Sequence, residues 1–264
     1  MSVEYAPLGL IGLLTPQANT TVEPEMAIMT PPGYAFVNAR LMSDKPTIEA
    51  RLVDYFATLS GQLRQFANAP IGTALVATSG MSYLAGVDAE ARILAEVSRA
   101  ANIPVFTSAI ASVDMLNALG AKRIALVSPY PESLNVASRA YWSAHGFTVA
   151  AETGAFRDTG AFHPIYSLFG GEALAALDAL PEADLDAVLM LGTGMPTLEP
   201  IRRRPFVGRA PVISCMLATA WRTTSALAKS PLTRASALAW IENPAWGPRL
   251  DELKALRGRQ TAGA

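Results

Sequence analysis

Hydrophobic positions along the chain follow two alternating patterns. Short β-branched and aliphatic runs end in small polar or glycine residues, and longer segments with helical periodicity follow them. The short runs predict strands at Leu8–Leu14, Phe36–Leu41, Thr73–Val76, Val105–Thr107, Arg123–Val127, Ala187–Leu191 and Val212–Ser214. The longer segments predict helices at Thr47–Asn68, Val87–Ala101, Ser108–Leu119, Glu132–His145, Glu172–Leu180 and Met216–Ala228. This alternation indicates an α/β protein with mainly parallel strands joined by crossover helices.

Three pairs of strand segments repeat in the same order along the chain. The pairs are Ile11–Pro16 with Ile124–Pro129, Thr73–Gly80 with Ala187–Gly194, and Ile103–Ser108 with Ala210–Cys215. The period is too long for a solenoid, so the repeat predicts a duplicated α/β unit.

The duplication predicts two pseudo-symmetric doubly wound domains, each with a mainly parallel sheet flanked by helices. We expect the first to comprise 1–114 plus 219–264, because the segment from Ser230 carries Trp240 and Trp246 and should pack back on the first half. The second should comprise 115–218. Ligands of open parallel sheets bind at the carboxyl ends of the strands, so the active-site cleft should lie between the domains.

Composition narrows the classes of function. The formal charge is −1, from 21 basic and 22 acidic residues mixed along the chain, so we expect no nucleic-acid partner. No apolar run reaches the length of a membrane helix, and the apolar start, Leu8–Leu14, is typical of a buried strand rather than a signal peptide. We therefore expect a cytoplasmic protein without a membrane partner. The sequence leaves the oligomeric state open, and a homo-oligomer is one of the alternatives.

Cysteine and histidine are scarce. The single cysteine cannot form an internal disulfide, and with the histidines at His145 and His163 it makes no recognised zinc spacing. No Gly-x-Gly-x-x-Gly follows the first strand, which argues against a nucleotide-binding domain. We expect neither a metal nor a cofactor.

The segment Gly12-Leu-Leu-Thr-Pro-Gln-Ala-Asn-Thr-Thr-Val-Glu23 resembles the Pro-x-x-Asn-Thr-Thr-x-Glu signature of maleate cis–trans isomerases. Arylmalonate decarboxylases belong to the same aspartate/glutamate racemase superfamily. The resemblance continues at Ala77–Gly80, at Ala125–Tyr130 followed by Asn135, and at Leu191–Gly194, so it covers nearly the whole chain.

The resemblance implies two pseudo-symmetric domains that hold a substrate carboxylate between strand-end loops, with one or two thiols moving a proton or attacking a double bond. Here the cysteine of the family pattern Cys-Thr-Ser-Gly falls at Ala77, and that of Ser-Cys-Gly-Gly falls at Thr193. A threonine hydroxyl without an adjacent base is a poor nucleophile near neutral pH. Thiol-based racemisation and isomerisation are therefore disfavoured.

The remaining loop residues suit carboxylate binding through backbone N–H groups and short polar side chains. The candidates for this role are Pro16, Asn19, Thr20, Ala77, Thr78, Ser79, Asn135, Gly192, Gly194 and Met195. Each also has a simpler interpretation, since Asn19-Thr-Thr is a common helix cap and the glycine loops are ordinary strand-to-helix turns.

The catalytic candidates are Tyr130, Thr193 and Cys215. Tyr130 can donate its phenolic hydrogen to a carboxylate or an enolate oxygen, with Asn135 in support, and Thr193 or Ser79 can hold a water. Cys215 follows an apolar strand, where a free cysteine is more often a small buried hydrophobic residue, so it qualifies only if the cleft reaches it. His163 lies in a Gly- and Phe-rich loop, where a surface or packing role is favoured, although such a loop could fold over the cleft.

Together these features predict a cofactor-independent lyase or isomerase for a small carboxylic or dicarboxylic acid, with decarboxylase-like or related proton-transfer chemistry preferred. Two alternatives stay open. One is a non-catalytic carboxylate-binding or sensory protein that kept the cleft, and the other is a hydrolase or hydro-lyase that activates a water.

Overall fold

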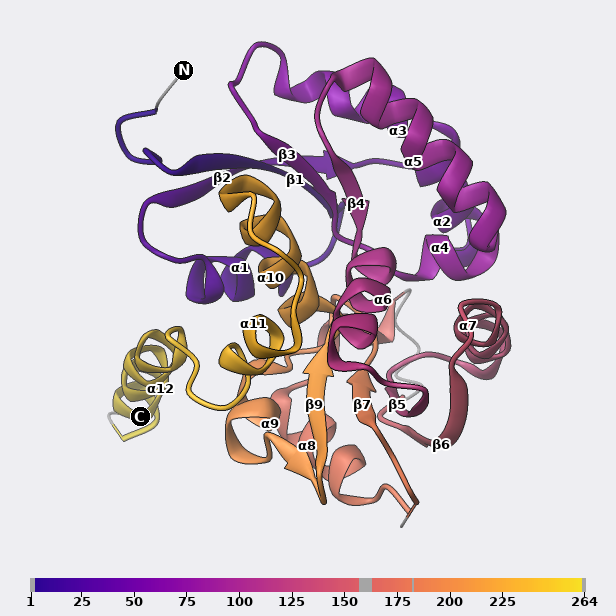
Figure 1. Ribbon diagram of the computed structural model, residues 1–264, viewed down its shortest axis with the longest axis vertical. Coiled ribbons are helices and arrows are strands. Elements are labelled where there is room, and N and C mark those ends of the chain that lie inside the picture. The colour runs from indigo at the N-terminus through magenta and orange to yellow at the C-terminus, as the bar shows by residue number, and fades with distance from the viewer. Residues whose placement is uncertain (1–2, 157–162, 182, 263–264) are drawn as a thin grey trace.

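The computed structural model describes residues 3–156, 163–181 and 183–262, and shows one sheet in each half of the chain (Figure 1). The first sheet is parallel throughout and has four strands in the order β2-β1-β3-β4. Its strands are β1 Gly9–Pro16, β2 Tyr34–Leu41, β3 Thr73–Val76 and β4 Val105–Thr107.

The second sheet has five strands in the order β6-β5-β7-β9-β8. All of its neighbours pair in parallel except β8, which is antiparallel to β9 at the edge. The strands are β5 Arg123–Ser128, β6 Thr148–Gly154, β7 Ala187–Met190, β8 Phe206–Val207 and β9 Ala210–Ser214. The predicted α/β class with mainly parallel sheets is confirmed.

The sequence repeat is also a structural repeat. Ile11 of β1 lies opposite Thr73 of β3, and the repeated partner of Ile11, Ile124 of β5, lies opposite Ala187 of β7. The duplicated strands therefore occupy equivalent places in the two sheets. The following helices begin alike, because the Thr107 hydroxyl accepts a hydrogen bond from the N–H of Ile110 and the Ser214 hydroxyl one from that of Leu217.

Helices connect and cover the strands. Those of the first half are α1 Val22–Met29, α2 Ile48–Ala57, α3 Leu59–Leu63, the 3₁₀ turn η1 Arg64–Phe66, α4 Gly80–Ala85, α5 Val87–Ala101 and α6 Ser108–Leu119. The later ones are α7 Glu132–Ala144, the 3₁₀ turn η2 Pro164–Ser167, α8 Gly170–Asp178, α9 Leu198–Arg203, α10 Cys215–Ala228, α11 Arg234–Ala239 and α12 Gly247–Ala262.

One local prediction was wrong, and several elements were not predicted, β6 among them. The single helix expected at Thr47–Asn68 is broken into α2, α3 and η1, and the break coincides with Thr58, whose hydroxyl donates to the carbonyl of Asp54. Strand β6 was not predicted, because this edge strand is mostly half-exposed and lacks a continuous apolar run.

The two halves are held together by helices α6 and α10, which pack against one another between the sheets (Figure 1). Helix α10 also contacts β1 and β3 of the first sheet, while α6 contacts β7 of the second. The C-terminal helices lie along the same boundary, α11 against α6 and α12 against α9. The domain limits of 1–114 plus 219–264 and 115–218 stay a prediction.

A buried carboxylate also joins the halves. The Oε1 atom of Glu25 on α1 accepts hydrogen bonds from the backbone N–H groups of Thr197 at 2.6 Å and Leu198 at 3.3 Å. The Thr197 hydroxyl lies 3.3 Å from Oε2 of Glu25 and 2.8 Å from the hydroxyl of Ser214. We call this group of four residues the Glu25 contact.

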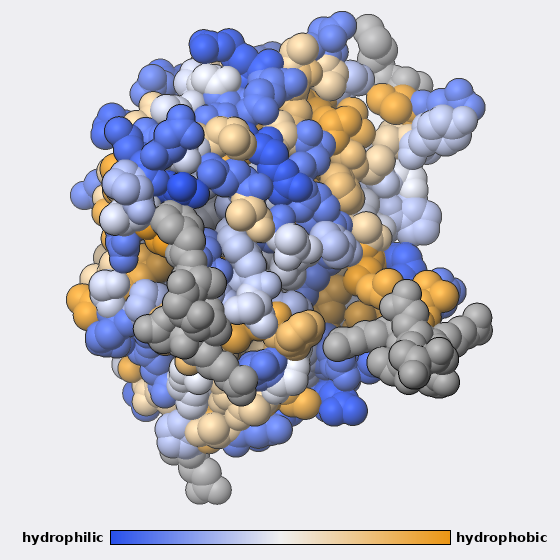
Figure 2. Space-filling model, turned by 180° about the vertical axis from the view of Figure 1, so that it is seen from behind, coloured by the Kyte–Doolittle hydropathy of each residue, from blue (hydrophilic) through white to orange (hydrophobic). Residues whose placement is uncertain are grey.

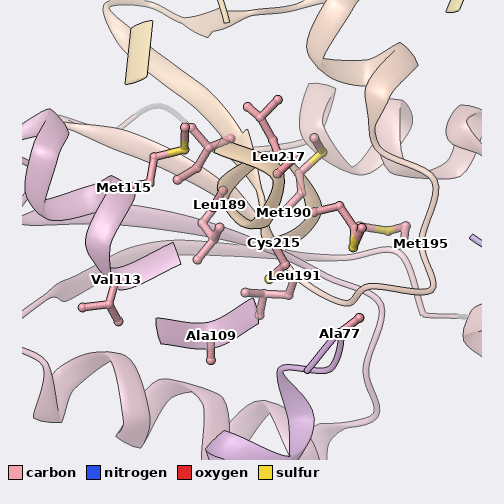
Figure 3. Packing of buried hydrophobic residues seen from close by; sticks show 14 of the residues in the cluster. Ala77, Ala109, Val113, Met115, Leu189, Met190, Leu191, Met195, Cys215 and Leu217 are labelled. Carbon is pink, nitrogen blue, oxygen red and sulfur yellow. The ribbon is translucent and has the colours of Figure 1, made fainter. Parts of the chain in front are cut away.

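Buried hydrophobic side chains form one continuous cluster across both halves, part of which Figure 3 shows. The outer face drawn in Figure 2 mixes hydrophilic and hydrophobic residues. Among the described residues, none of the helices is long and apolar enough to span a membrane.

Candidate functional site

A cavity opens where β1, β3, β5 and β7 end, between the two halves. It holds about 580 Å³ between its lining atoms, including the solvent at its mouth. The lining residues are Pro16, Gln17, Ala18, Asn19, Ile48, Arg51, Leu52, Tyr55, Thr78, Gly80, Tyr130, Leu134, His163, Ile165, Tyr166, Thr193 and Gly194. We call this space the strand-end cavity; it brings together Pro16, Asn19, Thr78, Tyr130, Thr193 and Gly194 of the sequence candidates.

Asn19 both caps the start of α1 and lines the strand-end cavity. Its Oδ1 atom accepts hydrogen bonds from the N–H groups of Thr21 at 2.8 Å and Val22 at 3.1 Å, at the start of α1. Its Nδ2 atom donates to Oγ1 of Thr193 across the boundary at 3.3 Å. The cap orients the amide, and one Nδ2 hydrogen remains for a ligand.

Thr193 and Ala77, where the family pattern has cysteines, meet across the boundary between the halves. The Thr193 hydroxyl donates to the backbone carbonyl of Ala77 at 2.8 Å. Its partners among the described residues are thus an amide and a carbonyl, and neither can take its proton. This arrangement disfavours Thr193 as a nucleophile.

Tyr130 is buried and lines the cavity. It shares a 3.1 Å hydrogen bond with the Ser79 hydroxyl, and its carbonyl accepts from Nδ2 of Asn135 at 3.1 Å. Asn135 in turn accepts a 2.5 Å hydrogen bond from Ser128, so it holds the Tyr130 loop from behind the cavity. Burial raises the pKa of Tyr130 well above its usual value, so the phenol stays protonated and can donate a hydrogen bond.

Cys215 lies fully buried in the hydrophobic cluster and does not line the cavity (Figure 3). Burial raises its pKa, against the smaller opposing effect of hydrogen bonds from Ser112, Ser79 and the Gly192 N–H. A thiol in these surroundings is protonated at neutral pH, which suits a structural residue rather than a nucleophile.

Other candidates lie outside the cavity lining. Thr20 is exposed and faces a different groove, beside α12, while Ala77, Gly192 and Met195 are buried behind the cavity. Gly192 has φ of +82°, and a Cβ atom added there would lie 2.6 Å from Pro129. Glycine is therefore required for the loop after β7 to turn so close to the loop after β5.

Sequence reasoning missed much of the remaining cavity lining, although it placed His163 in a loop that could fold over the cleft. Arg51 and Tyr55 come from α2, and His163 and Tyr166 come from the segment at η2. The His163 and Tyr166 rings contact one another with centroids 4.5 Å apart. No strand-end signal marks these residues, because their positions depend on how α2 and η2 pack over the sheet edges.

The charge of the cavity favours an anion. Arg51 lines it, and no aspartate or glutamate stands among its described lining residues. Burial, together with the nearby Arg51, lowers the pKa of His163 to about 4, so its imidazole is neutral at pH 7. Nowhere in the described part of the chain do three histidine, cysteine or acidic side chains cluster as metal ligands would.

The fold and the facing strand-end loops define an α/β protein of the aspartate/glutamate racemase superfamily. The family model described as arylmalonate decarboxylase matches residues 11–238, and the chain belongs to that family. It carries Ala77 and Thr193 at the two cysteine positions of the superfamily pattern.

Solved structures resemble most of the chain. Maleate isomerase from Pseudomonas putida, crystallised with maleate, is 22% identical with a TM-score of 0.75, over 84% of this chain and 93% of the isomerase chain. A variant of Nocardia farcinica maleate cis–trans isomerase with a covalently bound succinylcysteine intermediate is 26% identical with a TM-score of 0.74, over 84% and 94%. An arylmalonate decarboxylase is 19% identical with a TM-score of 0.61, over 83% and 92%. No curated protein sequence matches the chain.

Proposed function

We propose that this protein is a cofactor-independent lyase or isomerase that acts on a small carboxylic or dicarboxylic acid without thiol catalysis. Decarboxylation or a related proton transfer is the preferred reaction. The observation that carries the proposal is the strand-end cavity itself: neutral hydrogen-bond donors from both halves line it together with Arg51. Membership of the arylmalonate decarboxylase family supports this reaction class.

The donors of the cavity suit one carboxylate group. The Thr78 hydroxyl and the backbone N–H groups of Thr193 and Gly194 have no hydrogen-bond partner within the described part of the chain, and all three residues line the cavity. Together with the remaining Nδ2 hydrogen of Asn19, they offer neutral donors to an anion. Such preorganised donors stabilise an enediolate without reorganising during the reaction.

An apolar wall suits the departure of a second carboxylate. Ile48, Leu52, Leu134 and Ile165 line the cavity together with the aromatic rings. A carboxylate held against apolar side chains loses hydration, and it becomes neutral when it leaves as carbon dioxide. The Tyr130 hydroxyl can stabilise the enediolate left behind by donating a hydrogen bond.

One observation favours a second candidate function. Because the Thr193 hydroxyl donates to the Ala77 carbonyl and the Cys215 thiol lies outside the cavity, the chain lacks an accessible activated nucleophile at the family's thiol positions. A carboxylate-binding or sensory protein needs no such group. A hydrolase or hydro-lyase would instead have to hold its water on the Thr78 or Thr193 side of the cavity.

A ligand screen separates these functions. Thermal unfolding is measured with substituted malonates, maleate, aspartate and hydantoins, and every stabilising compound is then followed by proton NMR in deuterated water. Turnover or deuterium incorporation at the carbon next to the carboxylate is the expected result and establishes an enzyme. Stabilisation without either favours a binding protein, and no stabilisation by any of these acids contradicts the proposed site.

A further inference from the structure

We propose that the imidazole of His163 carries the proton that the reaction consumes, and that it takes up this proton when an anionic substrate enters the strand-end cavity. This inference rests on the proposed function. It assigns a proton source inside the cavity that is neither a thiol nor the Tyr130 phenol.

The position of His163 supports this role. The residue lines the cavity and contacts the Tyr166 ring, and its ring nitrogens have no hydrogen-bond partner in the parts of the chain that the structure describes. The other histidine, His145, lies at the end of α7 and does not line the cavity. His163 is therefore the imidazole that a ligand in the cavity can reach.

The surroundings of His163 make the protonation state of its imidazole depend on whether an anion is bound. Within the described part of the chain, the charged groups that act on it are Arg51 and Glu49 from α2, Tyr166 from η2 contacts its ring, and Tyr55 and Tyr130 line the same cavity. Burial and the Arg51 charge favour the neutral imidazole, as its lowered pKa indicates. A bound dianion adds negative charge beside the ring and offsets the charge of Arg51, and both effects favour the imidazolium.

The reaction then balances. The bond between the α-carbon and the departing carboxylate breaks, both electrons remain in the enediolate, and carbon dioxide leaves. The N–H bond of the imidazolium breaks, its proton forms the new C–H bond at the α-carbon, and neutral His163 remains. Water supplies the next proton when the following substrate binds.

The direct test is an NMR titration of the two histidines with malonate as the probe. Each imidazole gives one Hε1–Cε1 signal, and the His145→Gln variant assigns them. We expect the pKa of His163 to rise by about two units on saturation with malonate, while that of His145 moves by less than about 0.3. Malonate binding without a shift at His163 overturns this inference and leaves the proposed carboxylate site intact.

Variants sharpen the test. Arg51→Gln should raise the pKa of His163 in the empty protein, because it removes the charge that disfavours the imidazolium. Once a substrate is known, His163→Gln should lower kcat by about 100-fold with little change in KM, whereas His145→Gln leaves both unchanged. An unchanged kcat in His163→Gln overturns the inference. Failure of malonate to alter either the spectrum or the thermal midpoint contradicts the proposed carboxylate site as well.

Discussion

The Glu25 contact and the strand-end cavity both lie between the two halves, but their polar groups differ in hydrogen bonding. The polar groups of the Glu25 contact are paired, whereas some of those in the cavity are not. At the Glu25 contact the carboxylate accepts hydrogen bonds from two backbone N–H groups, and the residue is 5% exposed where it borders the groove beside α12. In the cavity, Thr78 and His163 keep polar atoms without partners among the described residues. A satisfied buried group stabilises the fold, whereas unpaired groups around open space are available to a ligand.

Perturbed pKa values alone do not separate these two regions. Burial raises the pKa of Glu25 to about 7 and lowers that of His163 to about 4, so desolvation acts on both. The difference lies in their hydrogen-bond partners: the Glu25 carboxylate has two backbone N–H donors, whereas the His163 ring nitrogens have no partner among the described residues. A shifted pKa is therefore a sign of function only where the group keeps hydrogen-bonding capacity for a ligand.

The largest expected effect is on the stability of the Glu25 contact. Glu25→Ala should lower the free energy of unfolding by about 3 kcal/mol, because it leaves a void and two unpaired N–H groups at Thr197 and Leu198. Urea denaturation measures the change. The exposed Glu96→Ala on α5 should cost less than about 0.5 kcal/mol, and equal losses in the two variants would contradict a structural role for Glu25.

The pH dependence of stability should carry opposite contributions from the two regions. The raised pKa of Glu25 adds stability that is present below about pH 4.5 and lost as the pH rises through 7, by at most about 3 kcal/mol. The lowered pKa of His163 acts the other way, adding stability as the pH rises from 4 to 6.5. Thermal unfolding from pH 4 to 8 should therefore show stability rising more steeply with pH in Glu25→Gln than in the parent, and less steeply in His163→Gln.

Within the cavity, Asn19 should matter most for ligand binding. Asn19→Ala should lower turnover or affinity by about 100-fold, and it should also cost about 1 kcal/mol of stability because the cap of α1 is lost. Asn19→Asp keeps an oxygen for the cap but places a negative charge in the cavity. Normal stability with weakened anion binding in Asn19→Asp is the expected result, and unimpaired binding in both variants would remove Asn19 from the site.

Tyr130→Phe should have a smaller effect. It removes one hydrogen-bond donor and leaves the ring in place, so we expect turnover or affinity to fall by about tenfold and the fold to stay intact. Kinetics or calorimetry with the acid found in the ligand screen measures this. Asn135→Ala, which loosens the Tyr130 loop from behind, should reduce activity while leaving the hydroxyl present.

The smallest effect should come from Cys215. Cys215→Ala should retain full activity and lose about 1 kcal/mol of stability, since the thiol is buried outside the cavity. Loss of activity in Cys215→Ala at unchanged stability would restore thiol chemistry to the mechanism.

Much of the fold was predictable because it depends on local patterns. The buried strands correspond to continuous apolar runs in the sequence, and the predicted bounds of α5 and α6 agree with the structure. The edge strand β6 and the break at Thr58 were not predictable in this way. An edge strand buries little, and a helix break depends on one side-chain hydrogen bond.

Sequence patterns were enough to identify the duplicated α/β units, the loops at the strand ends, and Ala77 and Thr193 in place of cysteine. These features follow from hydrophobic periodicity, internal repetition and residue identity, which all lie along the chain. In contrast, tertiary packing places Arg51 and His163 in the lining of the cavity and leaves Cys215 outside it. Both depend on how separate elements pack, and side chains that meet through packing leave no common pattern in the sequence.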